Sequence, residues 1–156
     1  MPNATICQKV ASFVFIGLIA LMIHTPTTQA EYRNPAVPGQ DTAAYWMDKG
    51  GLYSTYGNFP AAIRAFEKSL ALSPNNSEAY FDMGVAYGEM GDYQNALENM
   101  SKAIRLDPTN GRYLYGRAWI MLRSGRHKEA QVEMTRAANF GSADAKLYLQ
   151  RSETGR

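Results

Sequence analysis

Residues of matching size return every 34 positions along this chain, three times over. The clearest series are Trp46, Tyr80, Leu114; Gly57, Gly91, Gly125; Ala62, Ala96, Ala130; and Pro74, Pro108, Ser142. Such a period is typical of stacked supersecondary units, in which each unit buries its apolar face against the next. It predicts a repeat protein rather than one continuous core. Stacks of this kind usually present extended binding surfaces.

Within each period the pattern predicts two helices separated by a glycine turn. In the second unit, apolar residues at helical spacing run over Glu78–Met90 and Tyr93–Leu106. We expect Gly91 to adopt the left-handed conformation that ends a helix. Asp107-Pro108 should end the second helix, because proline disfavours helical geometry in the residue before it. The same plan predicts the remaining helices at Ala44–Tyr56, Phe59–Leu72, Arg112–Ser124, His127–Asn139 and Ala143–Arg151.

We therefore expect an all-α domain over residues 43–151. Its repeats would be 43–76, 77–110 and 111–144, closed by a capping helix over 143–151. A terminal helix is expected there because a last unit would otherwise expose the face that its neighbours bury.

The first 42 residues are expected to lie outside this domain. Residues 10–23 are apolar and uncharged, follow Lys9 and precede Thr28-Gln29-Ala30, a pattern typical of a secretory signal peptide over residues 1–30. An uncleaved membrane anchor is the alternative interpretation. A membrane-spanning helix needs about 20 apolar residues, more than residues 10–23 provide, so cleavage is the preferred interpretation. Residues 31–42 hold two prolines and a glycine without apolar periodicity and predict a flexible linker.

Composition restricts the chemistry of the exported chain. Cleavage after Ala30 removes Cys7, the single cysteine, and Lys9, which leaves 15 basic against 14 acidic residues. Disulfides and thiolate sites are then excluded, and the charge balance gives no reason to expect nucleic acid or an anionic membrane as partner. His127 is the remaining histidine, expected to pack half-buried, and no catalytic or phosphate-binding motif occurs. We expect no enzyme activity, no cofactor, no metal and no small-molecule substrate.

The 34-residue pattern resembles the tetratricopeptide repeat. The second unit fits best, with Tyr80, Gly84, Tyr87, Ala96, Met100, Ala103 and Pro108 at the characteristic positions of the family. The resemblance implies a helix-turn-helix solenoid, an α-α superhelix, that binds another protein or a peptide. Lys49 and Arg117 depart from the pattern, because the family usually has leucine there. Their charged ends are expected to extend to the surface.

The resemblance also implies a concave groove lined by the first helix of each repeat. The groove residues it implies are Met47, Asp48, Glu78, Phe81, Asp82, Val85, Glu89, Arg112, Tyr115, Trp119 and Arg123. Its aromatic members lie outside the packing positions of the family, and exposed aromatic side chains are typical anchors of protein recognition. Acidic residues near the first two repeats and basic residues near the third would steer a ligand of opposite charge order. The carboxylate clamp of chaperone-binding members is not expected, because Arg112 alone is basic at its positions.

The expected function is that of an exported interaction module, periplasmic or secreted, that binds a partner protein or extended peptide as a scaffold or assembly factor. One alternative is a small structural subunit of a cell-envelope complex, held at the inner membrane by an uncleaved N-terminal helix. Another is that the final helix or the 31–42 linker covers the groove aromatics. Self-association through an end or through the concave face, giving a homo-oligomer, is also left open.

Overall fold

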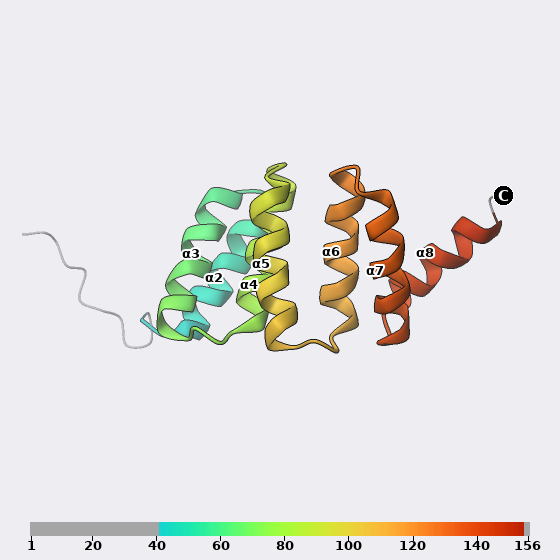
Figure 1. Cartoon of the computed structure of the whole chain (residues 1–156). Helices are drawn as coiled ribbons and strands as arrows, with labels where there is room; N and C mark the ends of the chain where they lie inside the picture. Colours follow the sequence, from blue (N-terminus) through green and yellow to red (C-terminus); the bar gives the residue numbers. More distant parts are fainter. Residues whose placement is uncertain (1–40, 155–156) are drawn as a thin grey trace, which may run out of the picture. The chain divides into compact units, whose positions relative to one another are not determined.

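The computed structural model describes residues 41–154, which form seven helices and no strand. In chain order these are α2 (Ala43–Thr55), α3 (Phe59–Leu72), α4 (Ser77–Glu89), α5 (Tyr93–Leu106), α6 (Gly111–Arg123), α7 (His127–Asn139) and α8 (Ala143–Thr154), as Figure 1 shows. The all-α prediction is confirmed. The first six predicted helices agree with the observed ones to within one residue at each end, whereas α8 continues beyond the predicted Arg151. The proposed signal peptide lies outside the described residues, as does the linker except for its last two residues.

Each helix packs mainly against its neighbours in the chain. The three hairpins are α2/α3, α4/α5 and α6/α7, and successive hairpins meet through α3/α4 and α5/α6, with α8 against α7. The buried apolar residues form two clusters: one joins α3 to α4, and the other extends from α4 to α8. This is the helical solenoid that the period predicts, since every seam is sealed by the next hairpin.

The turns inside the hairpins share one construction. Gly57, Gly91 and Gly125 all have φ between 72° and 81°, which confirms the left-handed turn predicted at Gly91. Gly141, between α7 and α8, has φ 90° and belongs to the same type. The chain thus enters α8 through a hairpin-type turn, and not through the Ser-Pro or Asp-Pro link that joins the other repeats.

The links between repeats end their helices as proline requires. Ser73 and Asp107, each followed by proline, have φ −140° and −138° and ψ 81° and 85°, well outside helical geometry. Asn76 and Asn110 then begin α4 and α6 by accepting a hydrogen bond from a backbone N–H of the first turn. Each repeat boundary is therefore encoded locally.

Small residues let the paired helices approach, as predicted. A Cβ added at Gly84 would lie 2.8 Å from Met100 Cγ, and one at Gly50 would lie 2.4 Å from the Phe66 ring. Ala96 and Ala103 are completely buried. Larger residues at these positions would force the helix backbones apart.

Two expectations about polar residues are wrong. Arg117 does not extend to the surface: its guanidinium forms an ion pair with Glu133 of α7 and donates to Ser101 Oγ of α5 at 3.1 Å. Only 18% and 11% of the two charged side chains are exposed. His127, the first residue of α7, is exposed rather than half-buried.

Candidate functional site

The predicted groove residues lie on α2, α4 and α6, the first helices of the three hairpins. Contacts between α2 and α4 and between α4 and α6 place these helices next to one another. We call the surface that they present the first-helix face, defined by the eleven groove residues given above. Because the helices follow one period, residues 34 apart lie opposite each other on adjacent helices.

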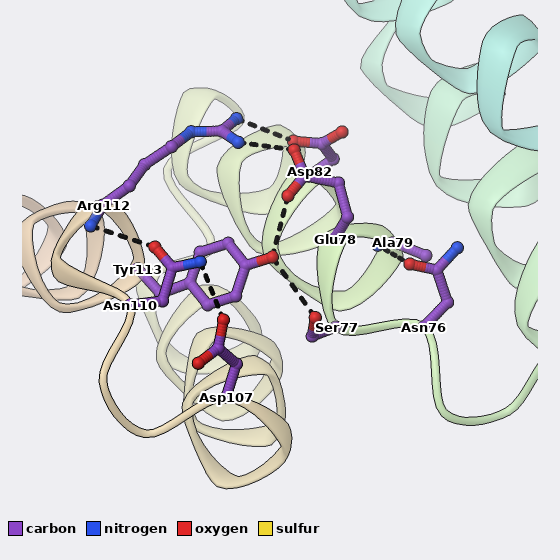
Figure 2. A network of polar contacts seen from close by, with 9 residues as sticks. All are labelled: Asn76, Ser77, Glu78, Ala79, Asp82, Asp107, Asn110, Arg112 and Tyr113. Atoms are coloured by element: carbon purple, nitrogen blue, oxygen red, sulfur yellow. Dashed lines mark hydrogen bonds and ion pairs between the residues drawn. The ribbon is translucent and has the colours of Figure 1, made fainter.

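A charged cluster forms between α4 and α6 (Figure 2). The Arg112 guanidinium donates to Glu78 Oε1 and lies 3.5 Å from Asp82 Oδ1. Tyr113 Oη donates to Glu78 Oε2 at 2.8 Å and lies 3.3 Å from Ser77 Oγ. One arginine thus faces two carboxylates, and the cluster keeps an excess of negative charge when both are ionised.

This arrangement raises the pKa of Asp82. Burial, and to a lesser extent the neighbouring Glu78 carboxylate, raise its pKa to about 6, while Arg112 acts to lower it. A partly desolvated carboxylate that shares one guanidinium with another acid is incompletely compensated. An additional cation beside Asp82 would therefore stabilise its ionised form.

A second ion pair forms further along the same two helices. Arg123 Nη1 donates to Glu89 Oε1 at 3.1 Å, again between residues 34 apart. The expected charge order is present, with acidic residues on α4 and basic residues on α6, but these side chains pair with one another. The repeat period is the reason, since it aligns opposite charges at equivalent positions of neighbouring repeats. Steering of a ligand by this charge order stays a prediction.

The prediction that Phe81 is an exposed anchor is also wrong, because only 5% of the residue is exposed. Its ring stacks on Tyr113 with centroids 4.8 Å apart, and the Arg112 guanidinium covers it at 4.6 Å. The missing side chain of Gly116 provides the space, since a Cβ there would lie 2.6 Å from Phe81 Cε2. Phe81 belongs to the core that supports the charged cluster.

The other aromatic residues of α6 differ from Phe81. Trp119 is 46% exposed, as predicted, and Tyr115 is half-buried, where it packs against the larger apolar cluster. Val85 of α4 packs partly buried against the same cluster. On α2, Met47 is partly buried against the smaller cluster and Asp48 is exposed. The face therefore offers one open indole beside a half-buried phenol.

The sequence reasoning missed three residues of the charged cluster: Ser77, Asn110 and Tyr113. Asn110 accepts from the Arg112 backbone N–H at 3.1 Å and donates to Asp107 Oδ2 at 3.0 Å, which holds the start of α6 in place. A signal for the charge pairing was present, because Glu78 precedes Arg112 by one period and Glu89 precedes Arg123 by one period. No comparable signal marked Tyr113.

Family models agree with the geometry. Three models, each described as tetratricopeptide repeat, match residues 43–76, 65–98 and 89–150, together more than half of the chain. The chain is a tetratricopeptide-repeat protein. No curated protein matches it.

Solved tetratricopeptide structures share the fold. The Arabidopsis OM64 TPR domain matches with a TM-score of 0.67 and 20% identity, over 73% of this chain and 96% of that one. The first TPR of Spaghetti (RPAP3), bound to an HSP90 peptide, matches with a TM-score of 0.66 and 19% identity, over 76% and 95%. MamA 41-end from Desulfovibrio magneticus RS-1 matches with a TM-score of 0.60 and 25% identity, over 62% of this chain and 55% of that one.

Two other kinds of site are absent from the described part of the chain. Among residues 41–154 there is no group of three or more His, Cys, Asp or Glu side chains that could hold a metal ion. Within the same range no helix has the length and apolar character needed to cross a bilayer.

The tetratricopeptide repeat is a protein-interaction fold and not an enzyme family.

Proposed function

We propose that this protein is an exported interaction module whose first-helix face forms a concave groove for an extended segment of a partner protein. The observation that carries this proposal is the exposed Trp119, which belongs with Tyr115 to α6, one of the three first helices. An indole that is almost half exposed can bury a large apolar area on contact without distorting the core. Tryptophan and tyrosine are also the residues most often found at interaction hot spots.

The polar chemistry of the face favours a partner segment with a cationic side chain. Asp82 and Glu78 share the single guanidinium of Arg112, and burial raises the pKa of Asp82 to about 6. A lysine or arginine from the partner would stabilise the ionised form of Asp82, so binding should strengthen as the pH rises through about 6. The proposed ligand therefore combines an apolar side chain for Trp119 with a cation for Asp82.

An acidic tail is a weaker candidate. The RPAP3 neighbour is bound to the HSP90 peptide SRMEEVD, which is rich in acidic residues. In this chain Arg112, the basic residue at the clamp positions that the family resemblance implies, is engaged by Glu78 and Asp82. A carboxylate entering here would meet two acids and one occupied guanidinium, so like-charge repulsion opposes it.

Affinity capture of partners from the periplasmic fraction tests the groove. Trp119→Ala and Tyr115→Ala should reduce recovery of the partner, because they remove apolar surface from the face. Phe140→Ala is the matched control, because Phe140 is 43% exposed but lies in the turn after α7. Equal recovery with Trp119→Ala and wild-type protein would exclude the groove as the binding surface.

Export and a role as scaffold or assembly factor are parts of the same proposal. They rest on the basic, apolar and small-residue pattern of residues 1–30, followed by a composition free of cysteine. N-terminal sequencing of the protein from its host distinguishes the outcomes: Glu31 supports cleavage and export, and Met1 supports a retained membrane anchor.

A further inference from the structure

Helix α2 has a partly exposed flank that corresponds to a more deeply buried one on α4 and α6. In those helices the flank packs on the preceding hairpin: α4 meets α3, and α6 meets both α5 and α4. Within residues 41–154 no helix precedes α2, which pairs with α3 and touches α4. By contrast, α8 covers the other end of the solenoid.

The flank of α2 has the same chemical order as the equivalent flank of α6. Two repeats separate the equivalent residues, and the α2 flank is defined by Tyr45, Trp46, Lys49, Leu52 and Tyr53, matching Tyr113, Leu114, Arg117, Ile120 and Met121. In both series an aromatic residue is followed by a large apolar residue, a cationic residue, an aliphatic residue and a second large residue. Their environments differ: Leu52 is 55% exposed, whereas Ile120 is 3% exposed and lies beside Gly88 of α4. The α2 flank is thus built like a helix-packing surface.

The cation on this flank has a satisfied counterpart in α6. Arg117 meets Glu133 from its own hairpin and Ser101 from the helix packed over it. At the position of Glu133 the first repeat has Ala65, and Lys49 is left with Tyr45 Oη at 3.3 Å and the Trp46 ring at 5.2 Å. In residues 41–154 no carboxylate lies within ion-pair distance of Lys49.

Further positive charge surrounds this position. A cavity of about 200 Å³ beside the α2 flank is lined by Trp46, Tyr53, Lys49, Arg64 and Lys68, with alanines and without an acidic residue. The Lys68 ammonium lies 4.0 Å from the centre of the Trp46 ring. An adjacent hollow is lined by the acidic Asp48 together with Lys49, Tyr45 and Leu52. Three cations beside the aromatic rings of Trp46 and Tyr53 favour a ligand that carries negative charge.

We propose that the α2 flank docks an acidic amphipathic helix of a partner protein, packed as α5 packs on α6. The helix would present apolar residues one turn apart, as Ala96, Met100 and Ile104 do in α5. It would place a carboxylate over Lys49 where Ser101 lies over Arg117. This flank shares no residue with the groove proposed above, so the two proposals stand or fall independently.

Charge complementarity decides between this occupant and the others. A second copy packed through its own α2 flank would bring Lys49, Arg64 and Lys68 against the same three cations. The first 40 residues of the chain hold one acidic residue, Glu31, followed closely by the basic Arg33. Neither supplies an acidic helix.

The chain itself provides the sequence of a test peptide. A synthetic peptide of residues 92–107 reproduces α5, and Ser101→Glu in the peptide adds the proposed carboxylate. Helices of this length are marginal in water, so a lactam between Glu98 and Lys102, which already form an i,i+4 ion pair at 2.8 Å, would stabilise the peptide. The receptor is the full chain with Trp119→Phe, in which Trp46 is the single tryptophan and reports on docking.

Binding is measured as a saturable change in Trp46 fluorescence. We expect Lys49→Glu in the receptor to weaken binding by about tenfold or more, since a close interfacial charge pair becomes a like-charge contact. A peptide with Ser101→Lys should reverse this preference and bind the Lys49→Glu receptor more tightly than the wild-type flank. Lys49→Gln, checked by circular dichroism, separates loss of charge from loss of fold.

Three results would overturn the proposal: no change in Trp46 fluorescence, equal affinities for the Ser101→Glu and Ser101→Lys peptides, or coverage by another part of this protein. A photo-crosslinker placed at Leu52 of the full chain examines the last. A crosslink to residues 1–40 of the same chain, or to a second copy, would assign the flank to that occupant. Because the receptor already lacks Trp119, failure of the groove hypothesis leaves this experiment unaffected.

Discussion

Removing the Glu133 side chain should destabilise the third repeat, although Glu133 lies on α7 and outside the proposed groove. Its carboxylate is 11% exposed and accepts from Arg117 Nε at 3.2 Å, and Arg117 itself is 18% exposed. Breaking a fully buried ion pair costs about 3–5 kcal/mol, because the remaining charge stays desolvated. Arg117 keeps its hydrogen bond to Ser101 and some contact with solvent. We therefore expect Glu133→Ala to lower the free energy of unfolding by about 2–3 kcal/mol.

The other two repeats provide the compensating changes. The second repeat has Met83 where the third has Arg117, and the first has Ala65 where the third has Glu133. The double variant Arg117→Met/Glu133→Ala removes both charges and should recover most of the loss, since a buried pair is often replaceable by apolar groups. Urea unfolding followed by circular dichroism measures both variants. Glu129→Ala, on the exposed side of α7, is the control and should leave the midpoint unchanged. A double variant less stable than Glu133→Ala would refute the reasoning.

Three further predictions concern packing and charge on the first helices. Gly88→Ala should cost about 1–3 kcal/mol, because its Cβ would lie 2.4 Å from an isoleucine of α6, whereas Gly51→Ala, with open space, should be neutral or stabilising in thermal melts. Asp82 has a raised pKa, so its contribution to stability is greatest while it is protonated and is lost as the pH rises through about 6; Asp82→Asn should remove a pH dependence of about 1–3 kcal/mol between pH 4 and 7 in urea titrations. Phe81→Ala should lower the free energy of unfolding by about 3–5 kcal/mol, whereas Trp119→Ala should lower it by less than about 1 kcal/mol. Similar urea midpoints for the two variants would contradict the burial of Phe81 and the exposure of Trp119.

Most helix boundaries were predictable because their signals are local. Gly91 adopts a left-handed backbone conformation, and Ser73 and Asp107 leave helical geometry because proline follows them. Both effects depend on the local sequence and not on the surrounding helices. The groove was less predictable, because exposure depends on what packs opposite. Phe81 and Trp119 are both aromatic residues at predicted groove positions, yet Phe81 fills the space beside Gly116 and Trp119 has no such neighbour.

The amino-acid sequence by itself determined the period, the helices, the turns and the small residues at the helix seams, because each depends on backbone preferences or on spacing along one chain. Only the tertiary structure decided that Arg112 would face Glu78 and Asp82, that Arg117 would be buried against Glu133, and that the flank of α2 would be left without a covering helix in the described chain. Those outcomes depend on which side chains meet across separate helices, and the free energy of a charged or aromatic group depends on the neighbours and the solvent it meets there.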